Sequence, residues 1–466
     1  MPSDSPFIHP YIPNAEPRVK RAMLDAIDAG SIEELYEDIP PELRFQGPLD
    51  VPPAIRSEGE LARFVSRLLK KNENCEDNLS FLGGGCYQHD VPAVCDEINA
   101  RGEFLTAYAG KTYTDHGKFQ ALFEFTSMMG ELLNMDVVSI PTYDGYQAAA
   151  TSLRMAGRIT KRRIALVPES ISPRMLAKFQ DYCQPELSIR VLPVEPETGR
   201  MDLQALADAL SEDVAAVFFE NPGYLGVLED RAPQIVQRAH AQGALAVVYV
   251  NPITLGLIAP PADYGADIAC GDIQPLGIHM QFGGGHGGFI ATHDDPTFVM
   301  EYPTRLYGMT PTVVPGEFGF GEVAFERTSF AHRERAKEFT GTAANLWAIT
   351  AGVYLALMGP QGMAELGETL LARAAYAMHQ LDGLPGVRAP RFQAPHFHEF
   401  VVDFTDTGLT VAEINRRLRE QGIFGGHDLS PEFPWLGQAA LYCITERHTQ
   451  ADIDRLAQTL SRIIHP

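Results

Sequence analysis

Short, wholly apolar runs alternate with helix-like stretches through the middle of the chain. Three of these runs, at 164–167, 215–219 and 244–250, are separated by segments with helical periodicity. Strands that are apolar on both faces are typical of a parallel sheet covered by helices on both sides. The pattern therefore predicts an α/β protein with a central, mainly parallel sheet.

The two ends of the chain have different patterns. Two helical stretches near the N-terminus flank a proline-rich passage at 39–53, and Gly359-Pro360 interrupts a long helical stretch near the C-terminus. Shorter strand-like and helical runs follow that interruption, which is typical of an α+β arrangement. We expect an N-terminal arm at 1–75, a large α/β domain at 76–335 and a small α+β domain at 336–466.

Composition and charge exclude several classes of protein. The 466 residues are 45% hydrophobic and 21% charged, as in folded soluble proteins, and the formal net charge is −23. Because phosphate backbones are bound by clustered Lys and Arg, this charge argues against nucleic acid as a partner. No apolar stretch reaches the roughly 18 residues that a membrane span needs, and the polar start MPSDSPF is not a signal peptide. We expect a cytoplasmic protein without a membrane partner.

The cysteine pattern supports the same compartment. The chain contains six scattered cysteines without a CxxC pair: Cys75, Cys86, Cys95, Cys183, Cys270 and Cys443. In a chain of this length, such spacing indicates reduced thiols, not a disulfide framework. It also predicts no zinc site and, with no other ligand motif, no metal site.

Polar residues follow the predicted strands, where open parallel sheets bind their ligands. Four such ends stand out: 143–145, 220–223, 251–252 and 271–275. Asp144 directly precedes a predicted helix. A helix N-terminus can bind phosphate, but Asp144 would repel one, and the favoured alternative is that Asp144 simply caps the helix.

The segment 282–289 is the densest in glycine, with glycine at five of the six positions from 283 to 288. Such a backbone can reach positive φ and lie close to another surface. A loop that lines a ligand or a subunit boundary is favoured over the alternative, a sharp bend before the strand at 289–292. His286 in this loop is a candidate proton carrier, although a single histidine is more often incidental.

The sequence resembles a known family most clearly at 256–268, 271–278 and 282–284, and further matches at 226–230 and 443–446 follow the same order. These segments are similar to the α-subunit of the two-subunit glycine decarboxylase, the P-protein of the glycine cleavage system. The resemblance spans nearly the whole chain. It implies an aminotransferase-like architecture, that of pyridoxal-phosphate-dependent transferases of fold type I.

The resemblance also implies where the cofactor is held. In the two-subunit enzyme a β-type subunit carries pyridoxal phosphate on a lysine, and by alignment Pro275 occupies that position here. No lysine occurs between Lys178 and Lys337. Asn251 stands where cofactor-binding relatives place an aspartate. Without the amine no internal aldimine can form, so we expect no covalently bound cofactor on this chain.

One segment departs from the family. The family loop after Thr106-Ala107-Tyr108 contains proline, glutamine and glutamate and ends in Ser-Gln-Gly, whereas residues 109–117 read AGKTYTDHG. This loop lies near the catalytic cleft in the family. The departure opens the alternative of a stand-alone paralogue that acts on another amino-acid-like substrate.

The main functional hypothesis is an α-type subunit of glycine decarboxylase, classed as an oxidoreductase. In a hetero-oligomer with a lysine-bearing β-type subunit, it would help decarboxylate glycine and pass the aminomethyl group to a lipoyl carrier protein. The alternatives are the stand-alone paralogue and a non-catalytic subunit that only stabilises its partner.

The predicted site residues follow from the strand ends, the glycine-rich segment and the divergent loop. The residues expected to line the cleft are Tyr143, Asp144, Asn251, Asp272, Gln274, Gly283 and Gly284. The catalytic candidates are His286, His116 and Lys111.

Overall fold

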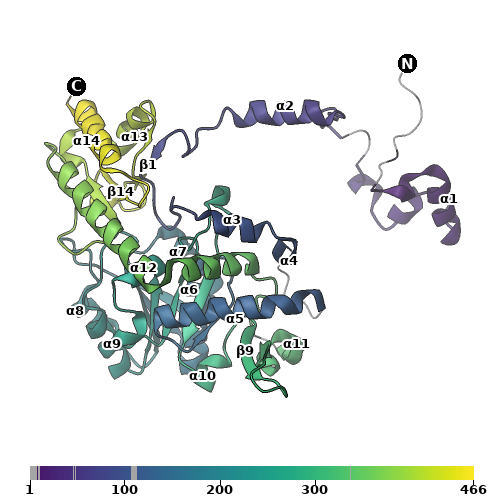
Figure 1. Ribbon diagram of the computed structural model, residues 1–466, viewed down its shortest axis with the longest axis horizontal. Coiled ribbons are helices and arrows are strands. Elements are labelled where there is room, and N and C mark those ends of the chain that lie inside the picture. The colour runs from purple at the N-terminus through teal and green to yellow at the C-terminus, as the bar shows by residue number, and fades with distance from the viewer. Residues whose placement is uncertain are drawn as a thin grey trace. The chain divides into compact units, whose positions relative to one another are not determined.

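The structure is a computed structural model that describes residues 8, 11–45, 47, 49–105, 113–335 and 337–465 (Figure 1). The chain separates into two compact units, Met1–Asn72 and Glu73–Pro466. None of the helices among the described residues combines the length and the apolar character that a membrane crossing requires.

The first unit is built from short helices with few buried side chains. Its elements are α1 (Pro17–Ala26), α2 (Glu58–Leu69) and the 3-10 turns η1 (Pro13–Ala15), η2 (Glu33–Tyr36) and η3 (Pro41–Leu43). The Glu16 carboxylate caps α1 by accepting from the Val19 N–H at 2.9 Å. Ser57 caps α2 in the same way. These caps satisfy N–H groups that have no partner within the helix.

A seven-stranded sheet forms the centre of the second unit, with the order β2-β8-β7-β6-β5-β3-β4. Its strands are β2 (Val137–Val138), β3 (Ile164–Pro168), β4 (Ser188–Leu192), β5 (Val214–Glu220), β6 (Leu245–Val250), β7 (Ile268–Asp272) and β8 (Gly288–Thr292). The five strands β3, β4, β5, β6 and β7 are parallel to one another, and β8 runs antiparallel to both of its neighbours, β7 and β2. The predicted mainly parallel sheet is confirmed.

Helices cover both faces of this sheet. Those that contact its strands directly are α5 (Tyr113–Leu133), α6 (Gly145–Thr160), α7 (Pro173–Tyr182) and α9 (Ala232–Ala241). This part of the chain also contains α3 (Ala93–Asn99), α4 (Gly102–Leu105), α8 (Leu203–Ala209), α10 (Pro296–Val299) and α11 (Ser329–His332). Successive residues of β5 enter different cores: Phe219 belongs to the core that includes Phe125 of α5, whereas Phe218 belongs to the core that includes Leu153 of α6. Because side chains alternate along a strand, only a sheet covered on both faces buries every residue of β5.

A smaller sheet lies in the C-terminal part, with the order β11-β14-β13. Its strands are β11 (Glu399–Asp403), β13 (His427–Asp428) and β14 (Ala439–Cys443), and its helices are α13 (Val411–Arg419) and α14 (Gln450–Ile464). Two strand pairs complete the unit: β1 (Leu79–Ser80) with β12 (Ile423–Phe424), and β9 (Leu306–Pro311) with β10 (Phe318–Val323). A capping box of Thr449 and Asp452 begins α14, as the sequence predicts.

The long helix α12 (Asn345–Asp382) connects the cores of the two sheets and packs against α5 (Figure 1). Tyr354 belongs to the core of the large sheet and Leu381 to that of the small one. The sequence predicts two helices here, but only Gly359, at φ 60°, leaves the helical conformation. Glycine adopts this φ freely and Pro360 can begin a helix, so the chain resumes helix at once. A domain boundary at residue 335 stays a prediction.

Replacing Gly256 by alanine tests how closely α12 packs against the turn that follows β6. A Cβ on Gly256, in the 3-10 turn η4 (Pro252–Gly256), would lie 2.3 Å from the backbone oxygen of Met363 in α12. Since backbone cannot move aside cheaply, we expect Gly256→Ala to lower the free energy of unfolding by about 1–3 kcal/mol in urea titrations. Gly341→Ala is the control, because a Cβ there meets no atom within 4 Å. Equal midpoints for the two variants would contradict this packing.

Candidate active-site cleft

Three parallel strands bring polar side chains together at their carboxyl ends. Glu220 ends β5, Asn251 follows β6 and Asp272 ends β7, and all three line an inner cavity of about 40 Å³. The other lining residues are Gly84, Gly85, Tyr87, Tyr146, Pro222, Gly223, Tyr224, Tyr249, Val250, Pro275, His398 and Glu399. The large sheet thus forms one wall, and the loop after β1 and the start of β11 form another.

Two buried glutamates face this inner cavity. Glu399 accepts from the Gly84 N–H at 2.7 Å and from the Tyr87 hydroxyl at 2.9 Å. Glu220 accepts from the Tyr224 N–H at 3.1 Å. Burial raises the pKa of Glu220 to about 8, with a smaller contribution from the charge of Glu399, and burial raises the pKa of Glu399 to about 7. Near neutral pH this pair therefore retains protons that exposed glutamates would lose.

Asp272 occupies the N-terminus of α6. One carboxylate oxygen accepts from the Gly145 N–H at 2.7 Å, and the other accepts from the Gln274 N–H at 2.9 Å. A Cβ on Gly145 would lie 2.5 Å from the Tyr249 hydroxyl and 2.9 Å from the Asp272 Cβ, so only glycine permits this approach. Asp144 accepts from the Gln147 N–H at 2.7 Å, so it caps the helix. Two of the chain's own carboxylates therefore satisfy this helix end.

An outer cavity of about 390 Å³ adjoins the inner one and shares Gly84, Gly85, Tyr146, Tyr224, Tyr249 and Asp272 with it. Its further polar lining residues are Cys86, Asp144, Ser172, Arg174, His286, His427 and Glu432. The His286 Nδ1 lies 3.2 Å from an Asp272 carboxylate oxygen. Hydrogen bonds to Asp272 and Cys86 raise the pKa of His286 to about 10, so its imidazole is protonated at neutral pH.

Asn251 is within hydrogen-bonding distance of a buried histidine, His398. The Asn251 amide nitrogen lies 3.2 Å from the His398 Nε2, and the His398 Nδ1 lies 3.5 Å from the Cys443 Sγ. Burial lowers the pKa of His398 to about 3, so the ring is neutral and can accept the amide hydrogen bond. Asn251 is thereby held by a neutral group, not by a charge.

The structure brings together four of the residues predicted from the sequence: Asp144, Asn251, Asp272 and His286 line the two cavities. Gln274 is fully buried, and its amide instead exchanges hydrogen bonds with the backbone of Tyr87.

The remaining predicted residues lie apart from the two cavities or outside the described part of the chain. Tyr143 is 56% exposed and, like Gly283 and Gly284, is not among the lining residues of either cavity. Lys111 lies outside the described residues, as does the side chain of His116. The site roles of all these residues stay predictions.

Sequence reasoning missed several groups that line the cavities. The strand end 220–223 stands out in the sequence, but Glu220 is not among the predicted site residues, although it is the one charged residue of a strand whose other residues are all apolar. Glu399 and Cys86 carry no such signal, because β11 and the loop after β1 reach the cleft only through tertiary packing. In the sequence, Tyr249 looks like an ordinary residue of an apolar strand.

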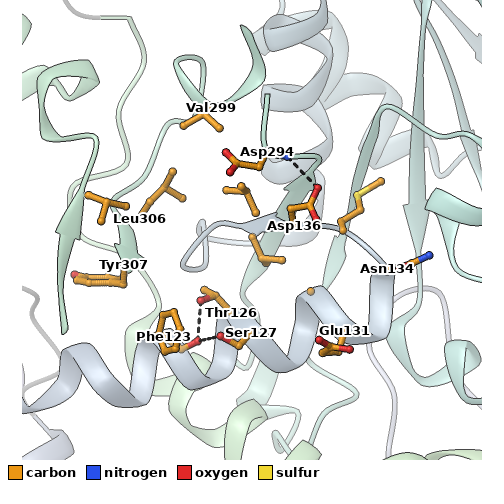
Figure 2. Close-up of a pocket in the computed structure, with 15 residues that line it drawn as sticks. Phe123, Thr126, Ser127, Glu131, Asn134, Asp136, Asp294, Val299, Leu306 and Tyr307 are labelled. Carbon is orange, nitrogen blue, oxygen red and sulfur yellow. Dashed lines mark hydrogen bonds between the residues drawn. The ribbon is translucent and has the colours of Figure 1, made fainter. Parts of the chain in front are cut away.

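A separate cavity of about 520 Å³ lies between α5, β2 and the β9–β10 hairpin (Figure 2). Polar groups there are bound locally: Thr126 and Ser127 donate to the Phe123 carbonyl, and the Asp294 N–H donates to Asp136 at 3.1 Å. Within the described residues, no group of three or more His, Cys, Asp or Glu side chains is arranged to hold a metal ion. The strand-end cavities are therefore the stronger candidate for chemistry.

Comparisons with known proteins agree over the full chain. Residues 9–460 match the family model described as glycine cleavage system P-protein. A relative from Desulfitobacterium hafniense, named probable glycine dehydrogenase (decarboxylating) subunit 1, is 35% identical over 97% of this chain and 99% of its own length. A protein of the same name from Geobacillus kaustophilus is 36% identical, with coverage of 97% and 99%.

Solved structures give the same fold. A crystal structure of glycine decarboxylase (P-protein) of the glycine cleavage system, in inhibitor-bound form, matches with a TM-score of 0.85 and 33% identity, over 98% of this chain and all of that one. A sphingosine-1-phosphate lyase from Burkholderia pseudomallei matches with a TM-score of 0.66 at 15% identity, over 90% and 93% of the chains. The predicted fold type I architecture is confirmed.

Replacing Glu220 by glutamine tests the buried carboxylate pair. Because the folded-state pKa of Glu220 lies above that of an unfolded glutamate, the folded state binds more protons between about pH 4.5 and 8, and stability falls as pH rises through that window. We expect Glu220→Gln to match the wild type at pH 5 and to exceed its unfolding free energy by about 1–3 kcal/mol at pH 8, measured by urea titration. The exposed Glu212→Gln is the control. A constant difference between wild type and Glu220→Gln at the two pH values would refute the pKa assignment.

Proposed function

Because the chain belongs to the glycine cleavage system P-protein family, we propose that it is the subunit of glycine decarboxylase that does not hold the cofactor. It acts with a lysine-bearing partner subunit. The complex decarboxylates glycine and transfers the remaining aminomethyl group to a lipoyl carrier protein. The observation that carries the proposal is the match to subunit 1 relatives over nearly the full length of both chains.

The relatives' name supports a two-subunit enzyme. A protein called subunit 1 works with at least one other chain, and here that chain must supply what this cleft lacks. The partner is proposed to contribute the lysine and the cofactor contacts. The proposed location in the cytoplasm remains a prediction.

The cleft of this chain does not suit pyridoxal phosphate, the cofactor of the fold family. The N-terminus of α6, where a phosphate would find N–H donors, already binds the carboxylate of Asp272. A phosphate placed there would meet a negative charge. Pro275 lines the inner cavity at the position where the resemblance places the lysine. These features support a cofactor held by the partner.

The residues of this chain then shape and support the complex instead of activating glycine themselves. Tyr146, Tyr224 and Tyr249 surround the cleft with aromatic rings, and the buried Glu220 and Glu399 keep it free of excess negative charge by retaining protons. We therefore assign no covalent step with glycine to this chain.

Reconstitution tests this assignment. We expect exchange of radiolabelled bicarbonate into glycine only when this chain is mixed with a lysine-bearing subunit 2 of the same family and pyridoxal phosphate, with neither chain active alone. The reason is that one chain supplies the cofactor amine and the other completes the complex. The measurement is the exchange rate against the ratio of the two chains, and we expect saturation at a fixed stoichiometry.

Two results would contradict the proposal. Exchange by this chain alone would favour a stand-alone enzyme of the same fold. Exchange by the partner that does not change when this chain is added would favour a subunit without a catalytic role.

A further inference from the structure

The first unit, Met1–Asn72, exposes more apolar side chains than its size explains. Among the described residues 34 large apolar side chains are exposed, and 18 of them belong to this unit. The other 16 are spread over the much longer second unit, Glu73–Pro466. Single exposed apolar residues are normal on a soluble protein, but such a concentration marks an interaction surface.

The helix α2 (Glu58–Leu69) carries the most regular part of this surface. Leu61, Phe64, Val65 and Leu68 follow the i, i+3, i+4, i+7 spacing that places side chains on one face of a helix. They are 46, 47, 40 and 54% exposed, and none of the residues of α2 is buried. The apolar face of this amphipathic helix therefore has no cover within the described part of its own unit.

A helix as short as α2 needs such a cover. It has 12 residues, and isolated helices shorter than about 12–15 residues are marginal in water because nucleation is costly. The Ser57 hydroxyl caps the helix by accepting from the Glu60 N–H at 3.3 Å, but one cap contributes little. Most of the stability of a helix in a protein comes from the packing of its apolar face. We therefore expect another surface to pack against Phe64 and its neighbours.

The helix α1 (Pro17–Ala26) adds to the same apolar surface. Val19 and Met23, four residues apart, are 43 and 52% exposed, and Leu24 is the one buried residue of this helix. A standard protein–protein interface takes roughly 20–30 residues from each side. The 18 exposed apolar side chains of the first unit are therefore enough for the apolar part of an interface of that size.

Neither the second unit nor a second copy of the chain offers a matching surface. Of the 16 exposed apolar side chains of the second unit, five lie in the β9–β10 hairpin, and the other eleven are isolated from one another in the described sequence. A second copy presents the same set of side chains. It also carries a formal net charge of −23, so two copies repel each other. A different chain fits better on both grounds.

We propose that the apolar face of α2 docks into an apolar groove of the lysine-bearing partner subunit. This inference rests on the proposed function, which supplies the second chain, and it assigns the contact to a particular helix. Arg63 and Arg67 lie on the opposite face of α2 from Phe64 and Leu68, so the docked helix keeps both guanidinium groups in solvent. Docking thus buries apolar side chains without burying an unpaired charge.

Hydrogen exchange of the full-length chain, alone and with subunit 2, tests what covers α2. We expect the amide groups of α2 to exchange at least about tenfold more slowly once subunit 2 is present in excess, because the helix is ordered by docking. Sedimentation of the isolated chain at several concentrations gives its oligomeric state in the same buffer.

Two results of this experiment would overturn the proposal. Slow exchange of α2 in the isolated monomer would mean that another part of the same chain covers the helix. Slow exchange that appears only as the isolated chain is concentrated would mean that a second copy does.

A pair of aspartate substitutions tests the apolar face itself. We expect Phe64→Asp to weaken the binding of subunit 2 at least about tenfold, because docking would bury the new charge. Arg63→Asp is the matched control, since it adds the same side chain one residue away on the solvent face, and we expect less than about a threefold change. Both variants should keep the urea midpoint of the isolated wild type, because α2 is uncovered there. Isothermal titration calorimetry gives the affinities, and equal losses in the two variants would refute the docking face.

The failure of this inference and the failure of the proposed function give different results. If subunit 2 binds and the mixture exchanges bicarbonate while α2 stays unprotected, the docking face is wrong and the proposed function stands. If subunit 2 does not bind the wild-type chain at all, the proposed function is wrong, and the docking inference falls with it.

Discussion

The carboxylate of Asp272 is the interaction on which the cleft depends. It receives the N–H of Gly145 at the start of α6, fixes the turn to Gln274 and pairs with His286. A helix N-terminus at the carboxyl edge of a parallel sheet is a natural anion site, and here the chain fills it with its own anion. The glycine at 145 and the packing of Tyr249 follow from this, because any larger residue would collide with both side chains.

Filling that site changes the chemistry of the whole cleft. Among the described residues, the inner cavity is lined by three carboxylates and four tyrosines, with the neutral His398 and no lysine or arginine. Such a lining disfavours a bound phosphate. Its two glutamates can nevertheless stay buried, because Glu220 and Glu399 retain protons near neutral pH.

Much of the fold follows from the sequence, and less of the site does. The apolar runs of β3, β5 and β6 predict a parallel sheet that is covered on both faces. Each run is apolar at successive positions, so side chains on both faces of the strand have to be buried. The sequence predicts two separate helices around Gly359, but the structure has one helix with a local break, since a single glycine at positive φ followed by proline needs no loop. Asp144, Asn251, Asp272 and His286 are found from their places after strands and in a glycine run. Glu399 and Cys86 are not, because only the packing of β11 and of the loop after β1 brings them to the cleft.

Borohydride reduction of the complex assembled with a lysine-bearing subunit 2 and pyridoxal phosphate tests most directly which chain holds the cofactor. Reduction fixes the cofactor to whichever lysine holds it as an imine, and peptide mass spectrometry locates it. The account predicts that all pyridoxyl label lies on the partner. A reduced cofactor on any lysine of this chain would contradict the account and would mean that Asp272 does not close the cleft to the phosphate.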